Sequence, residues 1–405
     1  MGEDDLETFS TSETPGAVSN RHREGGGGNG NVLCSIVIPS YNGRALLEVC
    51  LNSVFAHLPK DRAGYAEVIV VDDGSTDGTA EWLATRFPQV RVIKRDRNGG
   101  FCAAANAGLA AACGQFIQLL NNDTEVRPGW LQAGLAPFAD PTVGSVAPLV
   151  LVRSEPDRVD SAGDSYTLAG WPTKRGHGEP ACRWTLRTED EVFAASGSSA
   201  FYRTEAIGKV GGFDPLLGSY YEDVDLGFRL RWAGYRCVYS PDCQILHEIS
   251  ATYNHARPGL QRRMARNAEL VFWSNLPTGK LAAAIVPHTA LLVAQAGWRM
   301  VRLKFIPFFL GKVDAVRSIR EIRSRRKLRA DLARTAIAPA HFPLGLGSPS
   351  DLLNHLRRPR KPTNGGSAQT LRGAARGSLR NDLASSASLR GAASASLRGA
   401  SSRVK

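Results

Sequence analysis

The stretch Val68–Thr79 reads VIVVDDGSTDGT and decides the predicted fold class. An apolar, β-branched run leads directly into Asp72 and Asp73, and Gly, Ser and Thr follow before a helical segment. Such a run is typical of a central strand in a parallel sheet with both faces covered. Ligands of such sheets bind just beyond the carboxyl ends of the strands. Both aspartates are therefore candidates for binding a nucleobase or a ribose; the alternative is an Asp-rich turn with Asp77 near a helix N-terminus.

Short apolar runs alternate with helical segments on both sides of this stretch. The expected strands are Cys34–Ile38, Val68–Val71, Val90–Ile93 and Phe116–Leu120. The expected helices are Arg44–His57, Gly78–Phe87, Phe101–Cys113, Leu226–Gly234 and Arg262–Trp273. This alternation predicts an α/β, Rossmann-like fold, with a mostly parallel sheet and helices on both faces. Gly114 is expected to end the third helix, and the polar residues 155–192 are expected to form an inserted, loop-rich segment.

Two later groups of polar residues are candidates for binding a diphosphate. Arg97–Gly100 reads RNGG and precedes a helix that carries Asn106. Two glycines at a helix start let backbone N–H groups approach a ligand, although a plain helix entry explains them equally well. Asn121, Asn122 and Asp123 follow FIQLL, at a strand end where an oxygen ligand could hold Mg²⁺ or Mn²⁺. Since Asp123 is the lone carboxylate of the three, phosphate, water or other residues must complete any metal site.

The segment Tyr220–Asp225 reads YYEDVD and places three carboxylates within four residues, before a helix that carries Arg229 and Arg231. One function of such a cluster is to supply a general base, because neighbouring carboxylates repel and one pKa rises towards neutral. The alternative is a complement to the helix dipole, with ion pairs to the arginines. His247 follows a segment of alternating character, and a lone histidine is more often structural unless a metal lies close by.

Together these motifs resemble the family 2 glycosyltransferases with the GT-A fold, in particular a rhamnosyltransferase-like branch. Each motif alone is of moderate specificity, but the set follows the family's order over residues 35–276, which makes it specific. The matching stretches are SIVIPSYNG (Ser35–Gly43), VIVVDDGSTDGT (Val68–Thr79), RNGGFCAAANAG (Arg97–Gly108), LLNNDTEV (Leu119–Val126), GGFDP (Gly211–Pro215), YYEDVDLGFRLRWAGY (Tyr220–Tyr235) and LHEIS (Leu246–Ser250).

The resemblance implies a role for each matching residue. The residues that would bind the nucleotide sugar are Pro39, Tyr41, Asn42, Asp72, Asp73, Asn98, Gly99, Asn106, Asn121 and Asn122. The family's D-x-D metal motif becomes Asn-Asn-Asp here, so Asp123 would bind Mg²⁺ or Mn²⁺, with His247 completing the site. Glu222 and Asp223 match the family's catalytic pair, and Asp223 would be the base.

The resemblance also implies a reaction. The chain would be an inverting transferase that moves a sugar from a nucleotide-diphosphate donor, dTDP-rhamnose or a UDP-hexose, to a hydroxyl of a glycan or a lipid-linked sugar in cell-surface polysaccharide synthesis. A retaining transferase and a non-catalytic glycan- or nucleotide-binding protein on the same scaffold stay open as alternatives. A nucleotidyltransferase is disfavoured, because SIVIPSYNG lacks a Gly-rich loop with Lys or Arg.

Composition divides the chain into four expected parts: a disordered leader (1–31), the transferase domain (32–278), an apolar then basic helical segment (279–335) and a low-complexity basic tail (336–405). The net charge is +12, and residues 299–405 carry 23 Lys and Arg against 5 Asp and Glu. This basic part suits an anionic membrane surface. Few aromatic residues accompany the cations, so no nucleic-acid partner is expected.

The stretch Leu281–Leu310 is the most apolar part of the chain. It is expected to lie at a membrane interface, with a packing helix of the fold or a true span as alternatives. Seven cysteines without a C-x-x-C pair indicate a reducing compartment, and no apolar run follows the acidic first residues. The expected location is cytoplasmic, with peripheral attachment to the inner face of the membrane as an extension.

Overall fold

The computed structural model describes residues 32–59, 65–187, 190–249 and 257–345. These residues belong to one compact unit. The expected leader (1–31) and the basic tail beyond residue 345 lie outside the described residues. All seven cysteines are described, and none of them forms a disulfide.

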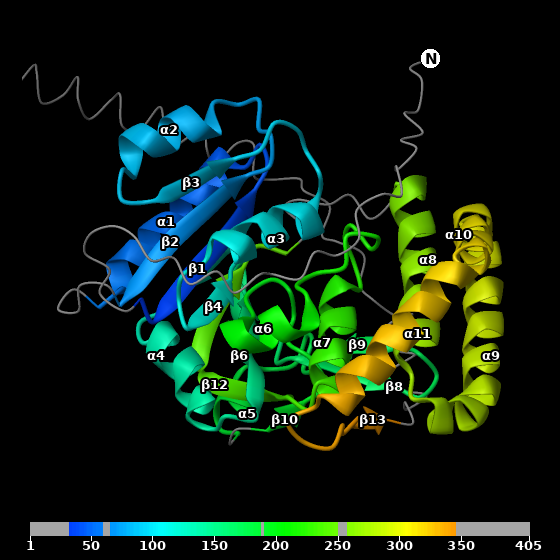
Figure 1. Ribbon diagram of the computed structural model, residues 1–405. Coiled ribbons are helices and arrows are strands. Elements are labelled where there is room, and N and C mark those ends of the chain that lie inside the picture. The colour runs from blue at the N-terminus through cyan, green and yellow to red at the C-terminus, as the bar shows by residue number, and fades with distance from the viewer. Residues whose placement is uncertain (1–31, 60–64, 188–189, 250–256, 346–405) are drawn as a thin grey trace, which may run out of the picture. The chain divides into compact units, whose positions relative to one another are not determined.

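A ten-stranded mixed sheet forms the centre of the unit, with the main strand order β10-β12-β6-β11-β4-β1-β2-β3, β5 beside β12 and β7 beside β6 (Figure 1). A second sheet holds three short strands in the order β13-β8-β9. The strands are β1 (Cys34–Ser40), β2 (Ala66–Asp72), β3 (Arg91–Lys94), β4 (Phe116–Leu119), β5 (Thr124–Val126), β6 (Val143–Val152), β7 (Glu155–Ser161), β8 (Asp164–Thr167), β9 (Pro172–Lys174), β10 (Glu191–Val192), β11 (Phe201–Arg203), β12 (Arg236–His247) and β13 (Leu344–Gly345).

The first half of the large sheet is parallel and the second half is mixed. Strand β1 pairs in parallel with β2 and β4, and β2 pairs in parallel with β3. Strand β11 is antiparallel to both of its neighbours, β4 and β6, and so joins the two halves. The register sets Ser40 opposite Asp72, so the carboxyl ends of β1 and β2 lie at the same edge. The predicted α/β fold class is confirmed, but the large sheet is mixed rather than mostly parallel, because β5, β7, β10 and β11 pair antiparallel with their neighbours.

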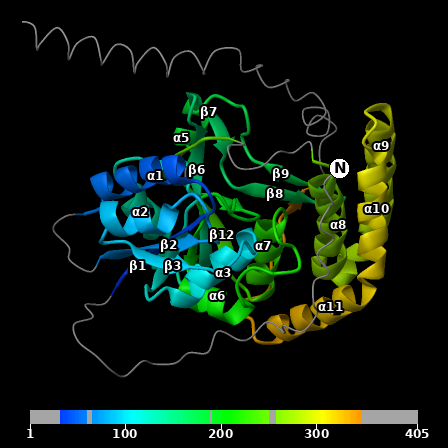
Figure 2. The ribbon, with the colours of Figure 1, turned by 90° about the horizontal axis from the view of Figure 1, so that it is seen from above.

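Helices cover both faces of the sheet because the strand residues alternate in direction (Figure 2). Ile36, Ile38 and Val70 pack with residues of α1, α2 and α4, whereas Val37 and Ile69 pack with residues of α3, α6 and α7. The helices of this part are α1 (Arg44–His57), α2 (Thr79–Arg86), α3 (Phe101–Ala111), α4 (Trp130–Leu135), α5 (Cys182–Thr185), α6 (Thr204–Val210) and α7 (Glu222–Trp232), and a 3₁₀ turn spans Ala136–Ala139.

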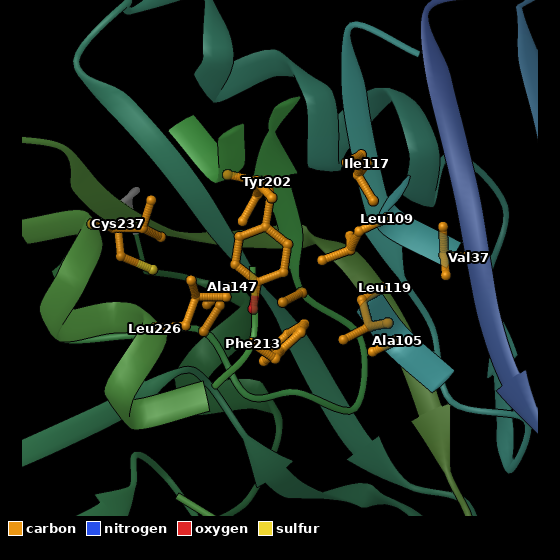
Figure 3. Packing of buried hydrophobic residues seen from close by; sticks show 14 of the residues in the cluster. Val37, Ala105, Leu109, Ile117, Leu119, Ala147, Tyr202, Phe213, Leu226 and Cys237 are labelled. Atoms are coloured by element: carbon orange, nitrogen blue, oxygen red, sulfur yellow. The ribbon is translucent and has the colours of Figure 1, made fainter. Parts of the chain in front are cut away.

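The larger of the two packed layers surrounds Tyr202 on β11, which is almost fully buried (Figure 3). Its ring meets Phe213 edge to face, with ring centroids 6.3 Å apart. Leu226 of α7 and Leu109 of α3 belong to the same cluster. The start of α7 and the start of α3 are thus fixed against one core, which matters because both carry candidate site residues.

Four helices follow the sheet: α8 (Pro258–Asn275), α9 (Thr278–Val301), α10 (Phe305–Arg317) and α11 (Ile319–Arg334). The apolar stretch Leu281–Leu310 is therefore divided between two helices, with a turn at Leu303, whose φ is 53°. Helix α11 packs against α7 and α8. Residues 336–345 follow α11 and return to the end of α7, where the N–H of Ile337 donates to the carbonyl of Ala233.

Two local expectations are wrong. Helix α3 ends at Ala111 with an extended residue after it, and Gly114 has no left-handed backbone. Glycine is needed there because a Cβ would lie 2.6 Å from the backbone N of Ser35. Residues 155–192 are not mainly loop, since they form β7, β8, β9, α5 and β10. Their polar composition conceals strands that are short and lie at sheet edges.

Candidate active site

The ends of β1, β2 and β4 bring most of the candidate residues to one place. Asp73 is fully engaged: it accepts hydrogen bonds from the backbone N–H groups of Gly99 and Gly100 and pairs with Arg95. Asp72 accepts one hydrogen bond, from the N–H of Ser75 at 2.9 Å, and its second oxygen is buried without a partner among the described residues. The two aspartates therefore differ, because Asp73 shapes a loop while Asp72 keeps an oxygen for a ligand.

The loop Arg97–Gly100 approaches the β2 end unusually closely. A Cβ on Gly74, whose φ is +76°, would lie 2.7 Å from the carbonyl carbon of Arg97. Glycine is required at that position both for the backbone conformation and for the space. Asn98 turns back on the loop, since its side-chain oxygen accepts the N–H of Gly100 at 2.9 Å. The N–H groups of Gly99 and Gly100 are already used by Asp73, so they are not free to bind a phosphate in this arrangement.

Asn42 and Asn122 tie the first strand to its neighbours. Asn42 has a left-handed backbone (φ 47°), donates its N–H to the Ser75 hydroxyl and accepts the N–H of Thr76 at its side-chain oxygen. Asn122 is buried and donates to the hydroxyl of Ser40 at 2.9 Å. Pro39 is the second-last residue of β1, and the ring of Tyr41, just beyond the end of the strand, is exposed. These contacts hold the β1 and β4 ends together at the edge where Asp72 lies.

The side chain of Asn106 does not join the residues at the ends of β1, β2 and β4. Both ends of its amide are bonded to the backbone of Phe213, at 2.8 Å each: the amide nitrogen donates to the carbonyl and the amide oxygen accepts the N–H. Its place on α3 therefore fixes the Gly-Gly-Phe-Asp loop. We assign it a positioning role, in contrast to the ligand contact that the resemblance implied.

The segment Ser196–Ser199 connects the β4 end to the start of α7. The carbonyl of Ser198 accepts the N–H of Asn121 at 2.8 Å, and the N–H of Gly197 donates to Asp223 at 3.1 Å. One short segment thus contacts both the Asn121–Asp123 group and the candidate base. We refer to residues 39–43, 72–75, 97–101, 121–123, 196–199 and 222–223 as the strand-end region.

The three carboxylates of the Tyr220–Asp225 motif have three different environments. Glu222 is buried, and burial together with the neighbouring Asp223 raises its pKa well above the usual range. Asp223 is half-buried and accepts the N–H groups of Gly197 and Val224. Burial would raise the pKa of Asp225, but Arg229 and Arg329 outweigh burial and hold it below its ordinary value.

The backbone just before Glu222 is strained. Tyr220 and Tyr221 have φ values of 68° and 72°, a left-handed conformation that costs free energy in a residue with a side chain. The amide of Asn267 on α8, which is fully buried, compensates by donating to the carbonyls of Leu217 and Tyr220 at 2.9 and 2.8 Å. Helix α8 therefore helps to set the direction in which Glu222 and Asp223 leave the loop.

His247 ends β12 beside the Asn121–Asp123 group. Its Nε2 lies 3.4 Å from Asp123 Oδ1, and its Nδ1 lies 3.0 Å from Asp160 Oδ2. Burial alone would lower the pKa of His247, but its hydrogen bonds to Asp123 and Asp160 outweigh burial and raise the pKa to about 9. Asp160 is itself fully buried and paired with Lys174 at 2.9 Å.

Asp123 and His247 could hold a divalent cation only if a bound diphosphate supplied further ligands. In the part of the chain that the structure describes, no cluster of three or more His, Cys, Asp or Glu side chains is arranged to hold a metal ion. Asp123 and His247 supply one oxygen and one nitrogen on facing side chains, and Asp160 fixes the ring from behind. Mg²⁺ and Mn²⁺ are commonly bound through one or two protein carboxylates plus substrate phosphates, so the residues suit a metal that arrives with a diphosphate.

Sequence patterns did not indicate two residues of this region. Asp160 lies in the segment expected to be loop, and its contact with His247 joins residues 87 positions apart, for which no local signal exists. Asp164 on β8 is buried, and burial followed by the charge of Asp223 raises its pKa well above the usual range.

The sheet order places an Asn-Asn-Asp group and a Glu-Asp pair beside the strand ends. Residues 35–211, less than half of the chain, match the model of glycosyl transferase family 2.

Two curated relatives and one solved structure illustrate the similarity. An N-acetylglucosaminyl-diphospho-decaprenol L-rhamnosyltransferase of Mycobacterium tuberculosis is 33% identical over 44% of this chain and 66% of its own length. A pre-mycofactocin glycosyltransferase of the same organism is 33% identical over 45% of this chain and 37% of its own length. The chain thus spans less than two thirds of both. The structure of S. aureus TarS with UDP-GlcNAc aligns at 18% identity with a TM-score of 0.48, covering 75% of this chain and 90% of that one.

Proposed function

We propose that the chain transfers a sugar from a nucleotide-diphosphate sugar to a hydroxyl group of an acceptor. The observation that carries this proposal is the position of Asp223, a half-buried carboxylate that Gly197 holds next to the Asn121–Asp123 group. A carboxylate in that place suits a general base, and the raised pKa of its buried neighbour Glu222 makes Glu222 a poorer candidate for the same role.

The chemical step is a single displacement that inverts the anomeric carbon. Asp223 takes the proton of the acceptor hydroxyl as that oxygen forms its bond to the anomeric carbon, and the bond to the nucleoside diphosphate breaks on the opposite face. The buried oxygen of Asp72 is the acceptor available to a base N–H or a ribose hydroxyl. NMR of the product anomer distinguishes inversion from retention.

Asp123 and His247 would hold Mg²⁺ or Mn²⁺ against the donor diphosphate. When bound, such an ion offsets the negative charge that develops on the leaving group. Within the chain, Asp160 keeps the His247 ring in place, and Asn122 fixes the strand end from which Asp123 projects.

The donor and the acceptor are inferred from similarity. The likeness to the mycobacterial rhamnosyltransferase supports dTDP-rhamnose, with a UDP-hexose as the second choice, and a lipid-linked sugar or a growing glycan as the acceptor. An acceptor of that kind places the reaction at the cytoplasmic face of a membrane, as part of cell-surface polysaccharide synthesis.

A donor screen tests the proposal. Purified protein is incubated with UDP-, dTDP- and GDP-sugars and Mn²⁺ or Mg²⁺, and the released nucleoside diphosphate is measured with and without EDTA. Release from one donor is expected, with loss in Asp223→Asn and no loss in Asp242→Asn, which alters an exposed aspartate on β12. No release, combined with no donor binding by calorimetry, would instead favour a binding protein on this scaffold.

A further inference from the structure

The outward side of α9 and α10 carries an exposed apolar surface. Its most exposed large side chains are Ile285, Val286, Val293, Met300, Val301, Leu303, Ile306 and Phe309, which we call the α9–α10 face. Val286 is 76% exposed and Leu303 is 94% exposed. Single exposed apolar residues are ordinary on protein surfaces, but a continuous group of them marks a surface that binds something.

The face follows helical geometry. Val286, Val293 and Met300 recur every seven residues, which is about two turns of an α-helix, so they form one stripe. Residues 281–298 include no Asp, Glu, Lys or Arg. Helix α9 has the length and composition to cross a membrane, and 11% of its most apolar window is buried. The exposed stripe is therefore long, uninterrupted and free of charge.

The inward side of α9 is fixed to α8 by a buried polar network. His288 lies 3.1 Å from Glu269 and 2.8 Å from the carbonyl of Ala169, and its ring stacks on Phe272 at 3.7 Å. Lys312 of α10 donates to the same Glu269 at 2.7 Å. Moving α9 away from α8 to span a bilayer would separate His288 from Glu269 and from the carbonyl of Ala169, at a large desolvation cost. The geometry therefore favours a helix that lies along a membrane.

Positive charges border the face. Lys280, Arg302, Lys304 and Arg317 are exposed at the ends of α9 and α10. The one acidic residue from Thr278 to Ser318 is Asp314, and Arg262 binds both of its oxygens. An apolar stripe with a cationic border and no uncompensated carboxylate matches an anionic bilayer: acyl chains for the stripe and phosphate groups for the border. A second copy of this face would meet the same cations and be repelled.

Helix α9 also carries Arg299, which is half-buried. The Arg299 guanidinium packs over the Phe308 ring at 4.9 Å, and its charge acts on the hydroxyl of Tyr221, the residue before Glu222. We propose that the α9–α10 face is a docking surface for an anionic membrane, with α9 in the headgroup plane. Docking is independent of the proposed transfer reaction.

Vesicle binding of the full chain tests this inference. Co-sedimentation is measured with phosphatidylcholine vesicles that either contain or lack phosphatidylglycerol, in about 0.5 M salt, which screens purely electrostatic attraction by the basic tail. Val286→Asp/Val293→Asp is expected to weaken binding by at least about tenfold. Leu186→Asp, which places a single aspartate at an 87% exposed leucine outside the face, should bind like the unchanged protein.

Three results would overturn the inference. The first is unchanged vesicle binding in the double variant, given that its circular dichroism and melting temperature match those of Leu186→Asp. The second is a dimer in analytical ultracentrifugation that becomes monomeric in the double variant while vesicle binding persists. The third is resistance to alkaline extraction from membranes, which would indicate a span. A second variant, Arg302→Glu/Lys304→Glu, is expected to lose binding only to vesicles that contain phosphatidylglycerol.

Discussion

Asp223 and Asp225 stand two residues apart on α7, yet they belong to two different regions of the molecule. Asp223 faces the strand-end region, where backbone N–H groups hold it and no cation in the described residues pairs with it. Asp225 faces the helices α8 and α11, where Arg229, Arg329 and Asn275 surround it. The same carboxylate chemistry is thus left without an ion pair in one region and held in a buried ion-pair network in the other. What separates the two is the presence of a buried arginine.

The largest effect is expected from removing the carboxylate of the candidate base. Asp223→Asn should lower the turnover number by about 10²–10⁴-fold, the usual contribution of general acid–base catalysis, because the acceptor proton then has no base. The free energy of unfolding should stay close to that of the unchanged protein, since Asp223 has no ion-pair partner to lose. Steady-state kinetics and urea unfolding measure the two quantities. Near-normal turnover would show that another group is the base.

The opposite pattern is expected on the structural side. Arg329→Met removes one of two cations from a buried carboxylate, and breaking a buried pair of this kind costs about 3–5 kcal/mol of stability. Activity per folded molecule should change less than the unfolding free energy. The control is Lys327→Met, an exposed position of the same helix. Equal stabilities of the two variants would mean that Arg329 does not hold α11 against α7.

A smaller effect is expected from changing Asp160, which contacts the candidate metal ligand His247. Asp160→Asn should weaken Mn²⁺ binding, measured by electron paramagnetic resonance with a nucleoside diphosphate present, by about 10–100-fold, because the ring of His247 loses the partner that orients it. Asp157→Asn changes an exposed carboxylate on the same strand and should have no effect. A loss of stability without a change in Mn²⁺ affinity would limit Asp160 to a structural role.

The smallest effect concerns pH and the junction of α8, α9 and α10. Burial would raise the pKa of Glu269, but His288 and Lys312 outweigh burial and lower it to about 2 from an ordinary value near 4.5. The stabilisation is therefore complete above about pH 4.5 and is lost as the pH falls towards 2. Unfolding free energies measured across this interval should fall less steeply in Glu269→Gln than in Glu155→Gln, a control at an exposed carboxylate. Parallel slopes would contradict the network.

Local patterns predicted the parallel half of the sheet well, because β1, β2 and β4 are apolar runs whose partners are equally apolar. They also predicted where these strands end, because each apolar run stops at polar residues. Local patterns could not predict the contrast between Asp223 and Asp225, since Arg329 lies 104 residues away from Asp225. Likewise, Asp160 is defined by a contact across the sheet that spacing along the chain does not encode.

The distance along the chain between Asp225 and Arg329 also has a consequence for biosynthesis. A ribosome adds about 5–20 residues per second, so about 5–20 s pass between synthesis of the aspartate and of the arginine that neutralises it. During that interval α7 carries a buried acid paired with Arg229 alone. A nascent chain is therefore expected to acquire the strands of its large sheet before α7 is fixed by α11, so that the ion-pair network around Asp225 is completed late in synthesis.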